Sequence, residues 1–184
     1  MKVVLGPASK QLGEKIAELL SVEAVPVVFE TFPDGESYVR LEGEVRKEEV
    51  FIVQTTSPPQ DAKLMQLAFI ADAAKRNEAK KVTAVVPYLA YARQDKTFLQ
   101  GEAISIETIA RMLKAAGIDS LITVNVHHEK MLAKFPFPAK NVSAIPLLAE
   151  YFKRKGHVRA FTLAPDKGAM QIVEEAKAVL DGEC

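Results

Sequence analysis

Short runs of β-branched and other apolar residues alternate along the chain with longer amphipathic stretches, and this alternation limits the folds open to it. The runs predict strands at Lys2–Leu5, Val25–Phe32, Val50–Gln54, Lys81–Pro87, Ser120–Val126 and Arg159–Ala164. The amphipathic stretches predict helices that begin near Ser9, Gln60, Ser105, Pro146 and Gly168. Because the strands are apolar nearly throughout, the alternation predicts an α/β fold in which helices cover both faces of a parallel sheet.

Three residues predict where individual helices begin or end. Ser105 offers a hydroxyl group that can cap the helix that follows it. Gly117 is expected to stop that helix, because glycine readily adopts the left-handed conformation found at helix ends. Pro146 suits the first turn of the next helix, where its missing N–H group leaves no bond unmade.

The segment Phe29–Leu41 departs from the strand–helix alternation. Two extended runs there are separated by the turn Phe32-Pro33-Asp34-Gly35-Glu36. Pro-Asp-Gly is a strong turn signal, so the segment predicts a β-hairpin inserted into the α/β pattern. Such a hairpin could present a projecting loop.

A second break in the pattern is Phe135-Pro136-Phe137-Pro138, where two prolines forbid regular helix. We expect a domain boundary shortly after it, which divides the chain into residues 1–143 and 144–184. The second piece is expected to hold only a helix, a strand and a helix, and it is smaller than most domains that fold alone. It therefore either packs onto the first domain or is the opening part of an incomplete second one.

Composition excludes several classes of protein. Lys plus Arg and Asp plus Glu each number 24, so the chain has no net positive charge with which to hold nucleic acid. Cys184 is the only cysteine, which excludes disulfide frameworks and zinc sites with several thiolates. The sequence has neither a long uninterrupted apolar segment nor a start typical of a signal peptide. We expect a cytoplasmic protein that binds neither membranes nor nucleic acid.

Ligands of open α/β sheets bind beyond the carboxyl ends of the strands, so residues that directly follow predicted strands are candidates for chemistry. The strand at Lys81–Pro87 is followed by Tyr88–Lys96, which combines two tyrosines with Arg93-Gln94-Asp95. An aromatic face beside an arginine suits a purine and its phosphates. As a run of charges alone, however, this segment would more often be a solvated loop.

Two of the three histidines, His127 and His128, lie at the end of the strand at Ser120–Val126. Adjacent residues of an extended segment point in opposite directions, so the two are not expected to bind one metal ion. A structural role, in which one caps the next turn and the other is solvated, competes evenly with a functional role. Because the sequence offers no thiolate or carboxylate cluster, a magnesium ion held mainly by substrate phosphates fits better than a closed zinc site.

Asp166-Lys167-Gly168 follows the last predicted strand. Asp166 is either a helix N-cap, which is the commoner role, or a ligand of a sugar hydroxyl or a metal-bound water. Asp34 and Glu36 in the hairpin turn are most often turn formers. The sequence has no Walker-type phosphate loop, no dinucleotide-binding glycine fingerprint and no nucleophile elbow. A nucleotide, if bound, is therefore not held in the manner of P-loop proteins.

Three motifs, in this order along the chain, resemble those of the ribose-phosphate pyrophosphokinases, also called phosphoribosyl pyrophosphate synthetases. They are Phe32–Glu36, Pro87–Asp95 and Ala164–Ala169, and the run Tyr-x-x-Tyr-Ala-Arg-Gln-Asp in the second is highly specific. The resemblance extends over essentially the whole chain, and the compact loop Leu99–Ala103 is similar to archaeal members. It implies a three-layer αβα fold with a parallel sheet like that of type I phosphoribosyltransferases, an inserted β-hairpin and the start of a second, similar domain.

The sequence departs from this family at two places. Many members have an aspartate two residues before the metal-associated histidine, where this chain has Asn125 before His127. The family's Thr-Gly-Gly-Thr loop, which cradles the 5-phosphate, has no counterpart before Cys184. The resemblance therefore implies that roughly the last third of a family chain is absent, and that the 184 residues alone are inactive.

The resemblance also implies a reaction, in which the diphosphoryl group of ATP is transferred to the anomeric hydroxyl of ribose 5-phosphate to give phosphoribosyl diphosphate and AMP. The residues implied in ATP binding lie in the hairpin turn and in the loop after Lys81–Pro87: Phe32, Asp34, Gly35, Glu36, Arg93, Gln94 and Asp95. The implied catalytic residues are His127 and Arg93. His127 and Asp166 would lie near Mg²⁺, and Asp166 and Lys167 would bind ribose 5-phosphate. In the family the hairpin serves the site of a neighbouring subunit, so a homo-oligomer is implied.

Two other functions remain open on the sequence alone. One is a non-catalytic regulatory relative, or a truncated ATP-binding fragment, of the synthetase. The presence of Arg93, His127 and Asp166 disfavours the regulatory relative, whereas the missing phosphate loop suits it. The other is a generic α/β module for a nucleotide or sugar phosphate, which leaves the ordered motifs unexplained. Release of AMP from ATP only when ribose 5-phosphate is present separates the enzyme from both.

Overall fold

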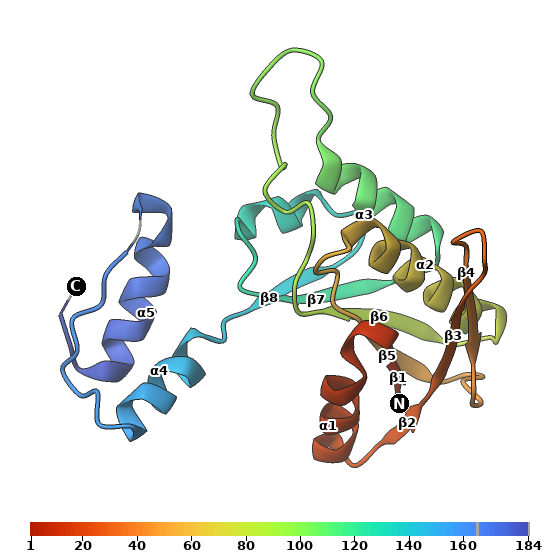
Figure 1. The fold of residues 1–184 in the computed structure, drawn as a ribbon, viewed down its shortest axis with the longest axis horizontal. Helices are drawn as coiled ribbons and strands as arrows, with labels where there is room; N and C mark the ends of the chain where they lie inside the picture. The colour runs from red at the N-terminus through yellow and green to blue at the C-terminus, as the bar shows by residue number, and fades with distance from the viewer. Residues whose placement is uncertain (165, 184) are drawn as a thin grey trace. The chain divides into compact units, whose positions relative to one another are not determined.

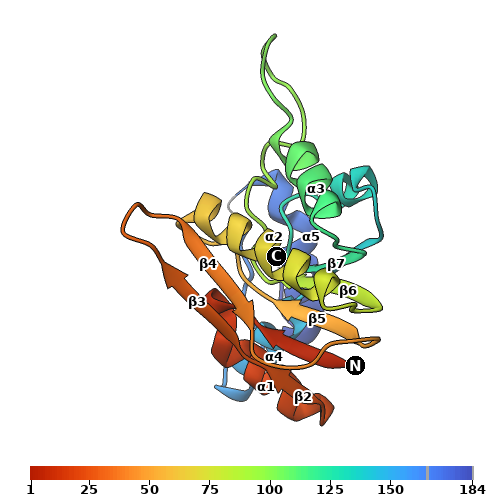
Figure 2. The ribbon, with the colours of Figure 1, turned by 90° about the vertical axis from the view of Figure 1, so that its right-hand side faces the viewer.

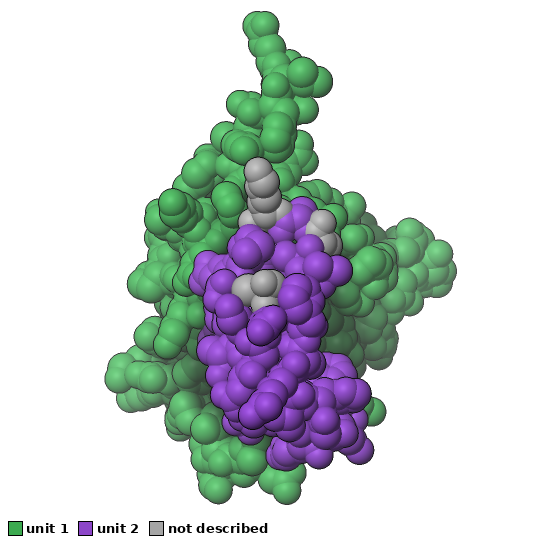
Figure 3. All heavy atoms as spheres, turned by 90° about the vertical axis from the view of Figure 1, so that its left-hand side faces the viewer, with its two compact units in different colours: residues 1–141 green, residues 142–184 purple. Residues whose placement is uncertain are grey.

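A computed structural model describes residues 1–164 and 166–183, with the side chain of Lys167 left out. The chain forms two compact units, residues 1–141 and 142–184 (Figure 3). The boundary predicted after residue 143 falls close to this division. The assignment of 1–143 and 144–184 as two functional domains stays a prediction.

The first unit is built on a parallel sheet, as the sequence predicts. Its strand order is β2-β1-β5-β6-β7-β8, and β1 pairs in parallel with β2 and β5, β5 with β6, and β6 with β7. The strands are β1 (Lys2–Leu5), β2 (Glu23–Val25), β5 (Glu49–Val53), β6 (Lys81–Val86), β7 (Ser120–Val124) and β8 (Ala139–Val142). The last of these, β8, is absent from the sequence prediction.

Helices cover both faces of this sheet, which makes the three layers that the resemblance implies. Figure 1 shows α1 (Lys10–Leu20) below the sheet, and α2 (Gln60–Arg76) and α3 (Ser105–Ala115) above it. Successive strand residues point to opposite faces. Val3 accordingly packs in the buried cluster on the α1 side, whereas Val4 belongs to the larger cluster that includes residues of α2 and α3.

The inserted hairpin consists of β3 (Val27–Thr31) and β4 (Ser37–Leu41), which pair antiparallel. The predicted strand Val25–Phe32 corresponds to β3, whereas β2 overlaps it only at Val25 and is otherwise absent from the sequence prediction. Pro26, which has no N–H group, separates the two strands. β4 packs against α2, and Figure 2 shows the hairpin extending beyond the sheet with its turn at the free end. The expected projecting loop is therefore confirmed.

Two of the three predictions about helix ends are confirmed. Pro146 lies in the first turn of α4 (Ile145–Arg154), and Gly117 has a φ of +102° just after α3. The cap predicted at Ser105 is wrong. The N-cap position is Ile104, and the Ser105 hydroxyl donates instead to Oε1 of Gln94 at 3.2 Å.

The second unit contains α4, the short 3₁₀ helix η3 (Lys167–Ala169) and α5 (Met170–Leu180), and α4 packs against α5. The strand predicted at Arg159–Ala164 is wrong, because these described residues belong to no strand. The N–H groups of Arg159 and Thr162 donate instead to the carbonyls of Leu180 and Glu183, at 2.9 and 2.8 Å. None of the helices in the described ranges is long and apolar enough to span a membrane.

Candidate functional site

The loops that follow β6 and β7 form a pocket at the carboxyl edge of the sheet. Because these two strands are parallel neighbours, the segments that leave them lie side by side. The pocket has a volume of about 230 Å³ and is lined by Tyr88, Leu89, Tyr91, Ala92, Arg93, Val124, Asn125, Val126 and His127. The structure therefore brings together Arg93 and His127, which the sequence places 34 positions apart.

The loop after β6 contains both buried and exposed residues. Leu89, Ala90 and Ala92 are buried, whereas Tyr88 and Tyr91 are exposed. Two non-glycine residues of the pocket have left-handed backbones, Tyr91 with a φ of +63° and Asn125 with a φ of +45°. Such conformations persist only where the surrounding structure holds them, and they are found preferentially at functional sites.

The neighbouring residues Gln94 and Asp95 do not line this pocket. Oε1 of Gln94 accepts the hydrogen bond from Ser105 described above. The Asp95 carboxylate is 3.5 Å from Nδ1 of His128. His127 lines the pocket and His128 faces Asp95, although the centroids of the two rings lie only 6.1 Å apart. That the two do not bind one metal ion stays a prediction. ATP contacts by Gln94 and Asp95 stay predictions.

The segment between Asp95 and α3 projects as a long loop (Figure 1). The Glu102 carboxylate accepts hydrogen bonds from the backbone N–H groups of Phe98 and Leu99, at 2.6 and 3.0 Å. These two N–H groups lower the pKa of Glu102 below its usual value. The carboxylate therefore favours a compact tip for this loop.

The hairpin turn is closed by its own hydrogen bonds and leaves its side chains exposed. The Phe32 N–H donates to the Glu36 carbonyl at 2.8 Å, and the Glu36 N–H donates to Oδ1 of Asp34 at 3.1 Å. Gly35 has a φ of +92°, which suits glycine, and Phe32 is 45% exposed. None of the residues lining the Arg93 pocket comes from this turn. The four predicted ATP-binding residues of the hairpin thus lie apart from that pocket within one copy of the chain.

Asp166 caps a helix in the second unit. Its Oδ1 accepts hydrogen bonds from the N–H groups of Gly168 and Ala169, at 2.7 and 3.2 Å, at the start of η3. This is the structural role that the sequence leaves open. Binding of a metal or of ribose 5-phosphate by Asp166 stays a prediction, and the side chain of Lys167, like Pro165 in the same motif, lies outside the described residues.

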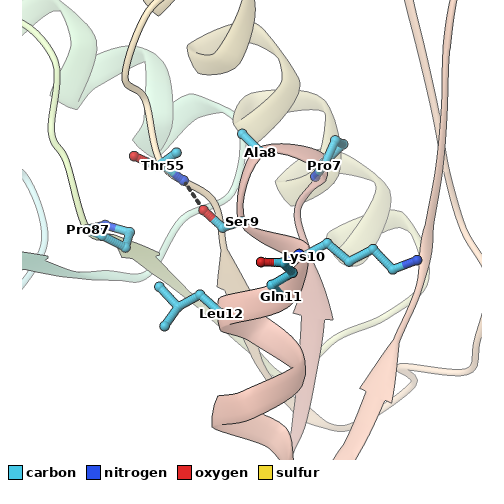
Figure 4. A pocket seen from close by; sticks show the side chains of 8 residues that line it. All are labelled: Pro7, Ala8, Ser9, Lys10, Gln11, Leu12, Thr55 and Pro87. Atoms are coloured by element: carbon cyan, nitrogen blue, oxygen red, sulfur yellow. Dashed lines mark hydrogen bonds between the residues drawn. The ribbon is translucent and has the colours of Figure 1, made fainter.

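A second pocket lies where sequence reasoning expects no site. The chain leaves β1 toward β2 and leaves the adjacent β5 toward β6, so the carboxyl ends of β1 and β5 form the switch point of the sheet. The pocket there has a volume of about 580 Å³ and is lined by Pro7, Ala8, Ser9, Lys10, Gln11, Leu12, Thr55 and Pro87 (Figure 4). The feature of the sequence that could have predicted this pocket is the position of Pro7–Leu12 after the first strand. The smaller pocket remains the candidate site because it contains both an arginine and a histidine.

The turn beside this second pocket is held by buried polar side chains. The Ala8 N–H donates to Oε1 of Gln54 at 3.0 Å, and the Thr55 N–H donates to Oγ of Ser9 at 2.8 Å (Figure 4). A Cβ atom on Gly6 would lie 2.4 Å from Oε1 of Gln54, so only glycine fits there. Close packing against Gln54 therefore explains why residue 6 is a glycine, and no bound ligand is needed to account for it.

The described residues contain no group of three or more His, Cys, Asp or Glu side chains that could hold a metal ion. His127 is accordingly not part of a metal cage made by the protein alone. This arrangement fits a hard cation such as Mg²⁺ only if phosphate oxygens and water supply most of the ligands.

Comparison with known proteins identifies the relatives of this chain. Residues 1–117 match the family model described as the N-terminal domain of ribose phosphate pyrophosphokinase. The chain belongs to this family. The resemblance to this family and the expected α/β fold class are thereby confirmed.

Individual members of the family match the chain over nearly all its length. The ribose-phosphate pyrophosphokinase of Methanobrevibacter smithii is 42% identical over 99% of the chain, and that of Saccharolobus solfataricus is 42% identical over 97%. The crystal structure of phosphoribosylpyrophosphate synthetase from Mycobacterium smegmatis superposes with a TM-score of 0.88 at 31% identity and covers the whole chain. The chain spans 61%, 62% and 61% of the lengths of these three relatives.

Proposed function

We propose that the protein acts as a ribose-phosphate diphosphokinase, which transfers the diphosphoryl group of ATP to ribose 5-phosphate. The observation that carries this proposal is the pocket that joins Arg93 to His127, in a chain of the pyrophosphokinase family. In the reaction the anomeric hydroxyl oxygen forms a bond to the β-phosphorus of ATP. The bond between that phosphorus and the oxygen of the α-phosphate breaks, AMP leaves, and the hydroxyl proton is released.

Such a transfer depends on positioning and on neutralising charge, because the protein forms no covalent bond to the phosphates. Arg93 suits this role, since its planar guanidinium can donate two parallel hydrogen bonds to phosphate oxygens. His127 lines the same pocket from the segment after β7 and can donate or accept one further hydrogen bond there. We assign to these two residues the binding of the triphosphate in the geometry for transfer.

The nucleotide would bind as its magnesium complex. Mg²⁺ supplies positive charge to the phosphates of ATP, and the scarcity of clustered acidic side chains near His127 fits a cation held mainly by those phosphates. Asp166 and Lys167 of the second unit are assigned to ribose 5-phosphate, with Asp166 also near the metal. Their position in the Ala164–Ala169 motif supports this assignment.

We assign the adenine and its ribose to the hairpin of a neighbouring copy. The exposed Phe32 can pack on a purine, and the carboxylates of Asp34 and Glu36 can accept hydrogen bonds from an amino group or hydroxyls. These residues are absent from the lining of the Arg93 pocket in the same chain, which supports a site shared within a homo-oligomer. The substrates are metabolites, so we place the enzyme in the cytoplasm.

The test is the release of AMP from ATP by a protein that contains these 184 residues and matches its relatives in length, measured with and without ribose 5-phosphate. The proposal predicts AMP and phosphoribosyl diphosphate in equal amounts only when both substrates are present. Hydrolysis of ATP that does not depend on ribose 5-phosphate would contradict it. Binding of ATP without turnover by the protein in its full length would favour the non-catalytic regulatory relative instead.

A further inference from the structure

Thr56 lies three residues after the end of β5, in the segment that leads to α2, and it is fully buried. Its Oγ1 donates a hydrogen bond to the carbonyl of Tyr88 at 2.7 Å and accepts one from the N–H of Ala90 at 2.8 Å. Its own N–H donates to the same Tyr88 carbonyl at 3.0 Å. Thr56 thus makes three hydrogen bonds to the start of the loop that carries Arg93, two to Tyr88 and one to Ala90.

These bonds hold the backbone at the start of the loop, whose side chains Leu89 and Ala92 also pack in the larger buried cluster. Ala90 is only 1% exposed, so its N–H group needs a partner within the protein, and Oγ1 of Thr56 is that partner. Arg93 follows three residues later, and the N–H of Gln94 donates to the carbonyl of Tyr91 at 3.0 Å. A shift of the backbone at residues 88–90 would therefore be passed on to Arg93.

A second contact joins the start of α2 to Tyr91, in the middle of the loop that carries Arg93. The hydroxyl of Tyr91 donates a hydrogen bond to Oδ1 of Asp61, in the first turn of α2. Tyr91 is also the residue with the left-handed backbone, which requires support from its surroundings. Thr56 and Asp61 together hold the loop at its start and at its strained residue.

We propose that Thr56, assisted by Asp61, is a positioning residue for the triphosphate-binding loop, which fixes where Arg93 stands in the pocket. This rests on the proposed function, since it assigns Thr56 a role in the same site. Thr56 itself does not line the pocket and is not expected to touch ATP. Its effect on binding acts through the backbone of residues 88–90.

The test compares Thr56→Val with Thr56→Ser. Valine keeps the shape of threonine but leaves the Ala90 N–H without its acceptor, whereas serine keeps the hydroxyl. We expect Thr56→Val to weaken Mg-ATP binding by about tenfold and Thr56→Ser to remain within about twofold of the parent protein. Hydrogen exchange of the amides of residues 88–94 should become faster in Thr56→Val only.

Thr83→Val is the matched control. Thr83 is also a buried threonine of the sheet, and its hydroxyl is 2.8 Å from that of Ser120, away from the loop. We expect it to lower the melting temperature by an amount comparable to Thr56→Val while leaving ATP affinity unchanged. A loss of ATP affinity in both variants would overturn the positioning role, because it would then follow from general destabilisation.

Two further variants keep the outcomes distinct. If Thr56→Val binds ATP like the parent while Arg93→Ala does not, the positioning role is wrong and the proposed site stands. If Arg93→Ala binds ATP normally, the proposed site fails, and the exchange of residues 88–94 still decides whether Thr56 holds the loop. Thr56→Ala, which also removes the hydroxyl, serves if Thr56→Val does not fold, and unchanged exchange at residues 88–94 in that variant would overturn the proposal. Tyr91→Phe removes only the bond to Asp61, and unchanged exchange in it would overturn the assisting role of Asp61.

Discussion

Arg93 is the one residue whose position in both the sequence motif and the pocket points to a single ligand group, a phosphate. We expect Arg93→Ala to weaken the binding of Mg-ATP by about 1.5–3 kcal/mol, because one charge-assisted hydrogen-bond donor is lost. Calorimetric titration of ATP measures this directly. Arg46→Ala is the control, since Arg46 is exposed and pairs with Glu78 at 3.0 Å, outside the pocket. An equal loss in both variants would remove Arg93 from the site.

His127 and His128 differ in what they face, so their substitutions should differ in effect. In a protein that contains these residues and matches its relatives in length, we expect His127→Ala to lower kcat more than it raises KM for ribose 5-phosphate, because His127 lines the pocket assigned to the triphosphate. His128→Ala should have a smaller effect, since His128 faces Asp95 outside that lining. Steady-state kinetics of both variants provide the test. A larger loss in His128→Ala would show that the wrong neighbour was chosen.

The residues that carry chemistry were easier to predict than the residues that hold them. Arg93 and His127 could be found because they lie in segments that follow apolar runs and belong to residue types that bind phosphates. Gln54 and Thr56 follow such a run as well, but a glutamine or threonine after a strand carries no pattern of its own. Their role depends on which loops the sheet brings beside them, and the sequence alone does not give the order of the strands.

Among the elements, the strands β1, β5, β6 and β7 were predictable because each is a nearly continuous apolar run, whereas β2, with the sequence Glu-Ala-Val, was not. The run Arg159–Ala164 has the same composition, yet it forms no strand among the described residues of the second unit. An apolar run becomes a strand only where a partner supplies the ladder of hydrogen bonds. The strand β8, in contrast, was not predicted, because its sequence Ala-Lys-Asn-Val is short and half polar. It is a strand because it pairs with β7 at the edge of the sheet.

A single carboxylate links three elements of the first unit. Asp119, which precedes β7, accepts hydrogen bonds from Nζ of Lys75 on α2 at 2.6 Å and from the N–H of Val82 on β6 at 2.8 Å. Burial acts to raise the pKa of Asp119, but the bonds from Lys75 and Val82 outweigh it, and the pKa is lowered. The ionised carboxylate therefore stabilises the folded state at neutral pH.

We expect Asp119→Asn to lower the free energy of unfolding at pH 7 by about 1–2 kcal/mol, because a partly exposed charge-assisted bond is lost. A carboxylate with a lowered pKa stabilises the fold above its unfolded pKa, and this stability is lost as the pH falls through the folded value. The parent protein and Asp119→Asn should therefore converge below the usual value of 3.8. Urea unfolding at several pH values measures both effects. Asp72→Asn, which breaks only an exposed pair with Arg76, should change stability by less than about 0.5 kcal/mol.

For the whole molecule, the separation between the hairpin turn and the Arg93 pocket predicts self-association. If Phe32, Asp34 and Glu36 complete the site of a neighbouring copy, ATP binding requires at least a dimer. We expect sedimentation at several concentrations to show an oligomer whose formation parallels the rise in ATP affinity. A monomer that binds ATP with the affinity of the assembled protein would rule out the shared site.

The last prediction concerns the acceptor, ribose 5-phosphate. A sugar phosphate needs backbone N–H donors or cations around its phosphate, typically from a glycine-rich turn at the start of a helix. The only candidate for such a turn after Asp166 in the 184 residues is Lys167-Gly168. The N–H groups of Gly168 and Ala169 already donate hydrogen bonds to the Asp166 carboxylate. We therefore expect residues 1–184 on their own to bind ATP and to form no phosphoribosyl diphosphate above background. Phosphorus NMR of the reaction mixture measures both. AMP formation that depends on ribose 5-phosphate, from protein of confirmed mass, would place the whole acceptor site within these residues.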